Sequence, residues 1–289
     1  MSKVWVNKKF FNIDKARISI FDRGFLYGDG VFETMRGYAG AVFKIDEHLD
    51  RLGRSLKVIG IRLPYSKNYL KKEIYRLIAV NKLKNAYIRL TLTRGEGRFG
   101  IEHKDALKPN VVIVAKKFTS YPGWMFDKGI SCHVVKIRQN ELSPISNVKS
   151  LNFLGYIMAR FEAKAAGAYE AILLNTKDHI AEAATSNLFI VKGNTVMTPS
   201  ITSGALPGIT RAVIIKIAKS LGLKVIEKSL FYKELMNSDE VFLTNSLAEV
   251  LPVTKIDRKM IGLGLPGDIT KLLHISYQKE VTRNSLLNG

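Results

Sequence analysis

The sequence predicts an α+β fold with two domains. Apolar residues recur at helical spacing in some segments and alternate with polar residues in others, and the two patterns are mixed without a regular strand–helix repeat. The chain has 289 residues, which is enough for two moderate hydrophobic cores. The periodicity breaks at residues 119–123, which end in Pro-Gly. We therefore expect a smaller N-terminal α+β domain over residues 1–119, a linker over residues 120–126 and a larger C-terminal α+β domain over residues 127–289.

The first domain is expected to open with two strands and two helices. Residues 4–11 predict two short strands around a tight turn. Asp46 is placed to cap the first helix, and Ser66 precedes the second. Apolar residues follow each position at helical spacing, namely Leu49, Leu52, Leu56 and Ile59 in the first helix and Leu70, Ile74, Leu77 and Ile78 in the second.

Strands and helices continue to mix through the rest of the chain. Residues 86–93 alternate strictly, so Tyr87 and Arg89 share one strand face while apolar residues occupy the other. Further elements are predicted as strands at 109–115, 130–136 and 170–175, a helix near 153–166, a hairpin over 189–197 and a helix that follows Ile209 and ends at Gly222.

The composition is typical of a globular protein and argues against several classes. Hydrophobic residues make up 46% and charged residues 24%. No apolar run approaches the roughly 20 residues that span a bilayer, and the N-terminus lacks a charged-then-apolar leader. We expect a cytoplasmic protein without a membrane partner. Cys132 is the only cysteine, which excludes an intrachain disulfide and predicts an inert packed thiol in a strand.

Neither a metal nor a nucleic acid is expected as a partner. The histidines show no metal-ligand spacing; they are His48, His103, His133, His179 and His274. The net charge of +20 would suit a nucleic acid or an anionic surface. The lysines are dispersed, however, without a basic block interleaved with aromatic residues. We interpret the charge as a lysine-rich solvated surface, and a basic binding protein without activity is the alternative outside the enzymes.

Lys149 and Glu182 together predict a pyridoxal phosphate site. This cofactor needs an amine for its Schiff base and an acid against its pyridine nitrogen, so that the protonated ring can accept electrons. Lys149 lies among apolar neighbours rather than on a polar face, and burial makes a lysine a better nucleophile by lowering its pKa. Residues 206–211 open a periodic helix, whose N-terminus supplies backbone donors and a positive dipole end for a phosphate.

These motifs resemble the fold-type IV pyridoxal phosphate enzymes, the family of branched-chain aminotransferases, D-amino acid aminotransferases and aminodeoxychorismate lyases. The matching runs extend from Ile18 through Lys271 and include an N-terminal signature at residues 21–36. The resemblance implies a two-domain D-amino acid aminotransferase-like fold, with the cofactor lysine in the larger domain. It also implies amino acid and 2-oxo acid substrates, and a homodimer or higher even-numbered oligomer in which a neighbouring subunit's loop completes each active site.

The resemblance assigns roles around the cofactor ring and phosphate. Lys149 resembles the Schiff-base lysine, which would also move a proton between the substrate α-carbon and the cofactor C4′. Glu182 resembles the pyridine-nitrogen acid, and Arg51 resembles the phosphate-binding arginine. Ile209 and Thr210 resemble the helix start that cradles the phosphate, next to a glycine that allows close approach.

The resemblance also implies which residues meet the substrate. Ser246 and Leu247 match a turn that contacts the phosphate and presents backbone N–H groups to the substrate carboxylate. Pocket-lining positions are matched by the aromatic residues Tyr27, Phe32 and Tyr87 and by Arg89, which resembles an arginine that meets the distal carboxylate of glutamate. Arg98 is a candidate second carboxylate clamp.

Two departures bear on the choice within the family. Thr34 stands where branched-chain aminotransferases usually carry glycine, which narrows the pocket and favours lyases, and Arg98 stands where an acidic residue is common. Residues 86–89, 204–211 and 261–267 nevertheless resemble branched-chain enzymes most closely. We expect an aminotransferase with a ping-pong mechanism that favours branched-chain L-amino acids or glutamate. Aminodeoxychorismate lyase and D-amino acid aminotransferase activities stay open as alternatives.

Overall fold

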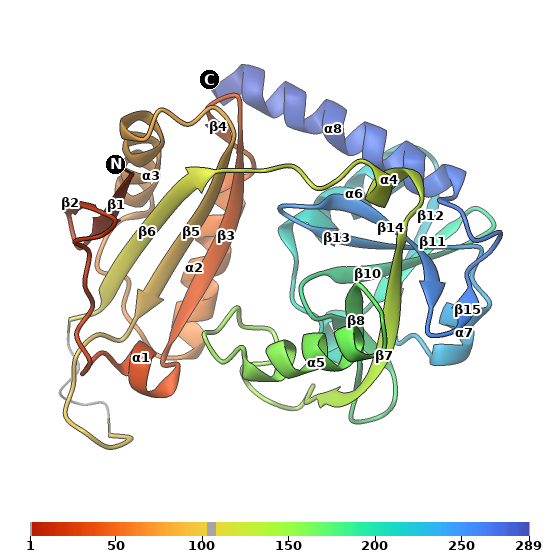
Figure 1. Ribbon diagram of the computed structural model, residues 1–289, viewed down its shortest axis with the longest axis horizontal. Helices are drawn as coiled ribbons and strands as arrows, with labels where there is room; N and C mark the ends of the chain where they lie inside the picture. Colours follow the sequence, from red (N-terminus) through yellow and green to blue (C-terminus); the bar gives the residue numbers. More distant parts are fainter. Residues whose placement is uncertain (1, 103–107, 289) are drawn as a thin grey trace. The chain divides into compact units, whose positions relative to one another are not determined.

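The computed structural model describes residues 2–102 and 108–288, and the chain divides into two compact units (Figure 1). Unit 1 comprises Met1–Thr119, Val148–Asn152 and Val281–Gly289, and unit 2 comprises Ser120–Asn147 and Phe153–Glu280. The first boundary lies where the periodicity of the sequence breaks. The segment that carries Lys149 groups with unit 1, whereas the sequence placed it in the C-terminal domain. Residues 120–126, expected as a linker, belong to unit 2.

Among the described residues of unit 1, six strands form one sheet with antiparallel pairing throughout, in the order β2-β1-β6-β5-β3-β4. Helices α2 and α3 cover one face of this sheet (Figure 1). The strands are β1 (Lys3–Val6), β2 (Lys9–Asn12), β3 (Gly30–Tyr38), β4 (Ala41–Val42), β5 (Ala86–Thr93) and β6 (Asn110–Lys117), and the helices are α1 (Arg23–Tyr27), α2 (Ile45–Val58) and α3 (Lys67–Val80). The predicted N-terminal strand pair, both helices and the 86–93 strand are confirmed.

The two faces of this sheet differ in character. Alternate residues of β5 that point toward the helices are fully buried, namely Ile88, Leu90 and Leu92. Tyr87 and Arg89 lie on the other face, which we call the tyrosine–arginine face. On β3, Thr34 lies directly opposite Arg89 and Arg36 directly opposite Tyr87. Because paired residues of an antiparallel sheet share a face, β3 contributes Phe32, Thr34, Arg36 and Tyr38 to the tyrosine–arginine face.

The two helices start differently from one another. The Ser66 hydroxyl accepts a hydrogen bond from the N–H of Tyr69 and caps α3, as the sequence predicts. The expectation that Asp46 caps α2 is wrong, because the N-cap is Lys44 in a left-handed conformation. Asp46 lies within the first turn of α2 and binds Lys71 of α3 at 2.8 Å. Its carboxylate therefore favours the helix through the dipole and joins the two helices.

Among the described residues of unit 2, nine strands form a mixed sheet with the order β12-β11-β10-β13-β14-β7-β8-β9, and β15 pairs with β14. The strands are β7 (Ile130–Gln139), β8 (Glu170–Asn175), β9 (Ile180–Ala183), β10 (Asn187–Lys192), β11 (Thr195–Pro199), β12 (Lys224–Lys228), β13 (Glu240–Asn245), β14 (Glu249–Ile256) and β15 (Lys259–Met260). The helices are α4 (Trp124–Asp127), α5 (Leu154–Ala165), α6 (Ile209–Ser220) and α7 (Tyr232–Met236), with a 3₁₀ turn η1 (Ile201–Ser203). Helix α8 (Asp268–Asn288) begins in unit 2, and its residues from Val281 onward are assigned to unit 1. The predicted strands, helices and hairpin of this half are confirmed.

The centre of unit 2 is apolar. Strands β8, β9 and β10 bury almost every residue, which indicates a sheet with both faces covered. Cys132 is fully buried on β7 as expected. Burial raises the pKa of its thiol well above the ordinary value, and the charge of Glu170 adds to that effect. Among the described residues, no helix has the length and apolar character needed to cross a bilayer.

Candidate active site

Lys149 is held by its own backbone along β3. The N–H of Phe32 donates to the carbonyl of Lys149 at 2.9 Å, and the N–H of Leu151 donates to the carbonyl of Gly30 at 3.0 Å. Val31 and Ser150 form an isolated antiparallel bridge between these bonds. The Val148–Asn152 segment thus extends the sheet beside the start of β3 and fixes the position from which the lysine side chain leaves the backbone.

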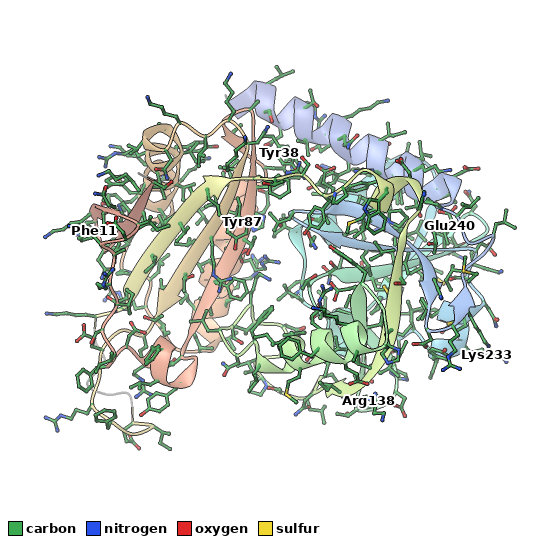
Figure 2. All side chains as sticks on the ribbon, in the orientation of Figure 1. Phe11, Tyr38, Tyr87, Arg138, Lys233 and Glu240 are labelled. Carbon is green, nitrogen blue, oxygen red and sulfur yellow. The ribbon has the colours of Figure 1, made fainter. Side chains whose placement is uncertain are left out.

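Two cations lie over the ring of Phe32. The Lys149 Nζ is 4.6 Å from the ring centroid, and the guanidinium carbon of Arg89 is 3.8 Å from it. Both distances are typical of cation–π contacts. Phe32 is 5% exposed, so its buried ring provides an apolar surface beside an amine and a guanidinium. Tyr87 extends the same face along β5 (Figure 2).

Arg51 belongs to a buried triad beneath the same strand. Its Nε and Nη2 donate to the two carboxylate oxygens of Glu33 at 2.7 and 2.6 Å, and His48 Nδ1 lies 2.7 Å from Glu33 Oε2. Burial alone would raise the pKa of Glu33, but the charge and hydrogen bonds of Arg51, with help from His48, outweigh it and lower that pKa to about 2. Burial, opposed by Glu33, lowers the pKa of His48.

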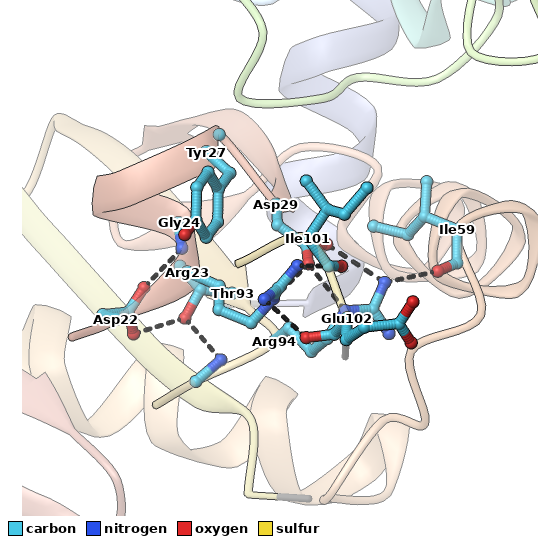
Figure 3. A network of polar contacts seen from close by, with 12 residues as sticks. Asp22, Arg23, Gly24, Tyr27, Asp29, Ile59, Thr93, Arg94, Ile101 and Glu102 are labelled. Atoms are coloured by element: carbon cyan, nitrogen blue, oxygen red, sulfur yellow. Dashed lines mark hydrogen bonds and ion pairs between the residues drawn. The ribbon is translucent and has the colours of Figure 1, made fainter. Parts of the chain in front are cut away.

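A second polar network anchors the loop that carries Arg98 (Figure 3). The Arg23 side chain donates to three successive carbonyl groups, those of Gly100 at 2.9 Å, Ile101 at 3.0 Å and Glu102 at 3.0 Å. The Tyr27 hydroxyl accepts a hydrogen bond from the N–H of Gly100 at 3.0 Å. The loop is therefore held by its backbone, whereas Arg98 itself is exposed.

Asp29 connects this loop to the rest of unit 1 (Figure 3). Its carboxylate accepts from Arg23 Nε at 3.0 Å and from Arg94 at 2.7 and 3.0 Å. Arg94 also donates to the carbonyls of Ile59 and Gly60, at the end of α2. Burial opposes ionisation of Asp29, but its bonds to the two arginines prevail and lower its pKa.

Glu182 is the centre of the candidate residues in unit 2. It is 5% exposed on β9. Its Oε1 accepts from the Tyr156 hydroxyl at 3.0 Å, and its Oε2 accepts from the N–H of Leu206 at 2.9 Å and from Asn187 Nδ2 at 3.4 Å. Hydrogen bonds from these neutral donors favour the charged form of the buried carboxylate.

The start of α6 is joined to Glu182 through Asn187. Asn187 Nδ2 also donates to the carbonyl of Leu206 at 2.8 Å. The N-cap Gly208 brings no side chain to the first-turn N–H groups, and a Cβ there would lie 1.9 Å from Asn187 Oδ1. Ile209 and Thr210 are buried at the first helical positions. Packing against Asn187 thus requires glycine at this helix start, and the first-turn N–H groups have no side-chain cap.

The turn with Ser246 and Leu247 lies beside the start of β10. Asn187 pairs with Thr244 of β13, two residues before Ser246. The side chain of Asn245 shapes the turn, because its Oδ1 accepts from the N–H groups of Leu247 and Ala248 and its Nδ2 donates to the Ser186 hydroxyl. A hydrogen bond thus joins this turn to the residue that precedes Asn187.

The structure assembles the expected residues into two sets. In unit 1, Lys149, Phe32 and Arg89 lie together, and in unit 2, Glu182 and the start of α6 lie together. A buried carboxylate, an amine on a fixed segment and a helix start that requires glycine are the groups that pyridoxal phosphate needs, so the residues fit that cofactor. His103 lies outside the described residues.

Four residues that support these sets were not singled out from the sequence: Glu33, His48, Tyr156 and Asn187. Glu33 stands inside the signature at residues 21–36 and Asn187 follows Glu182 by five positions, but neither position by itself indicates which side chain it will bind. Tyr156 follows Lys149 by seven positions in the sequence, and no local pattern connects it to Glu182.

Comparison with known proteins gives a family. Residues 30–256 match the model of amino-transferase class IV. The chain is 39% identical over 277 residues to a Methanocaldococcus jannaschii protein named "Putative branched-chain-amino-acid aminotransferase", covering 96% of this chain and 95% of that protein. It is 34% identical over 280 residues to the D-alanine aminotransferase of Bacillus licheniformis, covering 96% and 97%. The crystal structure of the T.th. branched-chain amino acid aminotransferase with pyridoxamine 5′-phosphate has a TM-score of 0.93 at 30% identity, covering 98% and 95%.

Proposed function

We propose that this chain, which belongs to the class IV aminotransferases and uses pyridoxal phosphate, favours branched-chain L-amino acids and glutamate as amino donors to 2-oxo acids. The observation that carries the proposal is the position of Lys149 and Arg89 over one buried aromatic ring. An amine, an apolar surface and a guanidinium within one group of residues suit a substrate whose side chain is either branched and apolar or ends in a carboxylate.

The cofactor supplies one part of the chemistry. When bound, pyridoxal phosphate provides a ring that accepts the electrons left when the substrate α-proton is removed. Under the proposal, Glu182 holds a proton at the ring nitrogen, which requires the carboxylate to remain charged. Its three neutral hydrogen-bond donors support that state.

The remaining residues bind and move a proton. Lys149 carries the amine that takes the proton from the substrate α-carbon and returns it in the opposite half-reaction. The N–H groups of Ile209 and Thr210, together with the Arg51 guanidinium, bind the phosphate. The turn of Ser246 and Leu247, which Asn245 holds in shape, lies against the substrate α-carboxylate. A ping-pong sequence follows, because one set of residues serves the donor and then the acceptor.

The test compares two arginines of unit 1. Replacing Arg89 by Ala should lower kcat/KM for glutamate and 2-oxoglutarate by about 10- to 100-fold, which corresponds to the roughly 1.5–3 kcal/mol of a hydrogen bond to a charged group. Leucine should be nearly unaffected. Arg98→Ala is the matched control, since it removes the same side chain from an exposed loop position and should change glutamate turnover little. Loss with Arg98→Ala but not with Arg89→Ala would overturn the proposal.

A second candidate is transfer from D-alanine. Thr34 is half-buried and lies directly opposite Arg89 on the tyrosine–arginine face, so its side chain takes space that glycine would leave open. A narrower space favours a small donor such as alanine over leucine. Thr34→Gly should then raise kcat/KM for leucine relative to D-alanine. Turnover of aminodeoxychorismate, but of neither amino acid, would instead identify the lyase.

We also propose a homodimer or higher even-numbered assembly. Helix α5 presents an unusually apolar outer side at helical spacing, with Leu154, Met158 and Phe161 exposed by 68%, 53% and 67%. Sedimentation velocity should show a dimer or larger species for the natural chain and a monomer for Phe161→Lys. Leu263→Lys is the control, because Leu263 is more exposed than any of them and lies in the loop between β15 and α8. A wild-type monomer would contradict the assembly.

A further inference from the structure

Tyr156 lies on the inner side of α5. It packs against the small cluster that contains the fully buried Ala159 and Ala163, which follow it by three and seven positions. The outer side of the same helix is exposed and apolar. The phenol ring is thus held by packing, and the ring of Phe153 at 4.8 Å limits its rotation further. Its hydroxyl reaches from the helix to a strand residue, Glu182 on β9, at 3.0 Å.

The two oxygens of Glu182 have different partners. Oε2 is bound by groups of the 187–206 region, the N–H of Leu206 and the side chain of Asn187. Tyr156 binds Oε1 from a different element. A carboxylate held at both oxygens by donors from separate elements loses its freedom to rotate about its terminal bond. Each donor also stabilises the charged form and makes the carboxylate a weaker base.

The hydroxyl of Tyr156 remains a donor through the neutral range. Burial raises its pKa, and the negative charge of Glu182 and the hydrogen bond to it raise it further, while a hydrogen bond from the Gln139 side chain acts in the opposite direction. Proton sharing therefore leaves the proton on the phenol and the charge on Glu182. The bond removes negative charge density from Glu182 without neutralising it.

We propose that Tyr156 is a positioning residue that keeps Glu182 oriented and weakly basic, so that the cofactor's ring proton stays on the ring nitrogen rather than moving to the carboxylate. This inference rests on the proposed function, in which Glu182 faces that nitrogen. Without the phenol, Glu182 becomes a stronger base and a less fixed one. Its share of the proton rises, and the ring accepts electrons less well.

The test uses the holoenzyme with cofactor labelled with ¹⁵N at the ring. In Tyr156→Phe the nitrogen resonance should move toward the position of an unprotonated ring, and kcat should fall by about 10-fold or more, as expected for a lost hydrogen bond to a charged group. KM for the amino donor should change by less than about 3-fold, because none of the residues proposed to contact the substrate is altered. An unmoved resonance would overturn the inference even if kcat fell.

Tyr232→Phe is the matched control. It removes the same hydroxyl from another tyrosine–carboxylate bond of unit 2, the 3.3 Å contact with Asp257. It should leave the nitrogen resonance and kcat unchanged. A similar shift in this variant would show that the effect is general and would overturn the assignment to Tyr156.

A cofactor-free measurement separates this inference from the proposed function. In the apo chain, carbon NMR of the labelled Glu182 carboxyl should show a higher pKa in Tyr156→Phe and a lower pKa when 3-fluorotyrosine, a stronger donor of the same shape, occupies position 156. The fluorinated chain keeps the test available if Tyr156→Phe fails to fold. No change in either direction would refute the role of Tyr156. Wild-type protein that binds no cofactor, with these pKa changes intact, would refute the proposed function instead.

Discussion

Glu33 should make the stability of this protein depend on pH well below neutrality. It is fully buried and accepts two hydrogen bonds from Arg51 and one contact from His48. Its pKa is about 2 in the folded chain against an ordinary value of 4.5. The difference of about 2.5 corresponds to ~3 kcal/mol of folding free energy at about 1.4 kcal/mol for each pH unit.

The sign of this effect follows from the direction of the pKa change. Because the folded pKa lies below the unfolded one, the contribution is complete above about pH 5 and is lost progressively as the pH falls from about 4.5 toward 2. Glu33→Gln should therefore lower the free energy of unfolding by ~3 kcal/mol or more at pH 7, since Arg51 also loses its charged partner in a buried position. Near pH 2 the natural chain and the variant should differ much less.

The assay is urea unfolding of both chains at several pH values between 7 and 2.5, followed by far-ultraviolet circular dichroism. The same pair should be compared in a His48→Gln background, because burial lowers the pKa of His48, which contacts the Glu33 carboxylate and also gains a proton in acid. Other carboxylates cancel in the difference between the two chains. A difference that stays constant from pH 7 to pH 2.5 would refute the reasoning about the buried pair.

Three further changes test single features. Lys149→Ala should abolish transamination and the visible absorbance of lysine-bound cofactor, and full activity would exclude Lys149 as the reacting amine. Gly208→Ala should weaken cofactor binding and destabilise the fold by ~1–3 kcal/mol, because its Cβ displaces Asn187. Gly155→Ala is the control and should be tolerated, because a Cβ there meets no atom within 4 Å. Equal cofactor-binding curves for the two variants would contradict the role of Gly208. Arg23→Gln should free the 100–102 loop and accelerate tryptic cleavage after Arg98 by about 10-fold or more, with exposed Arg17→Gln as the unaffected control.

The sequence by itself determined the features that depend on neighbours in the chain. Strict alternation defined β5 over Ala86–Thr93, and a side-chain cap defined the start of α3 at Ser66. The motifs around Lys149 and Glu182 identified the cofactor and the family, because the amine, the acid and the helix start that the cofactor requires each lie in a short segment that can be recognised without knowing the fold.

Only the tertiary structure decided which side chains meet across distant segments. Asp46 looked like a helix cap, but a lysine of α3 lies within reach of its carboxylate and the helix begins earlier. The Lys149 segment joined the first sheet through backbone bonds to β3 that no periodicity encodes. The Tyr156 hydroxyl reaches Glu182 because α5 packs beside β7 and β8. Hydrogen bonds and buried charges act over a few ångströms of space regardless of separation along the chain, so their partners follow from packing rather than from local pattern.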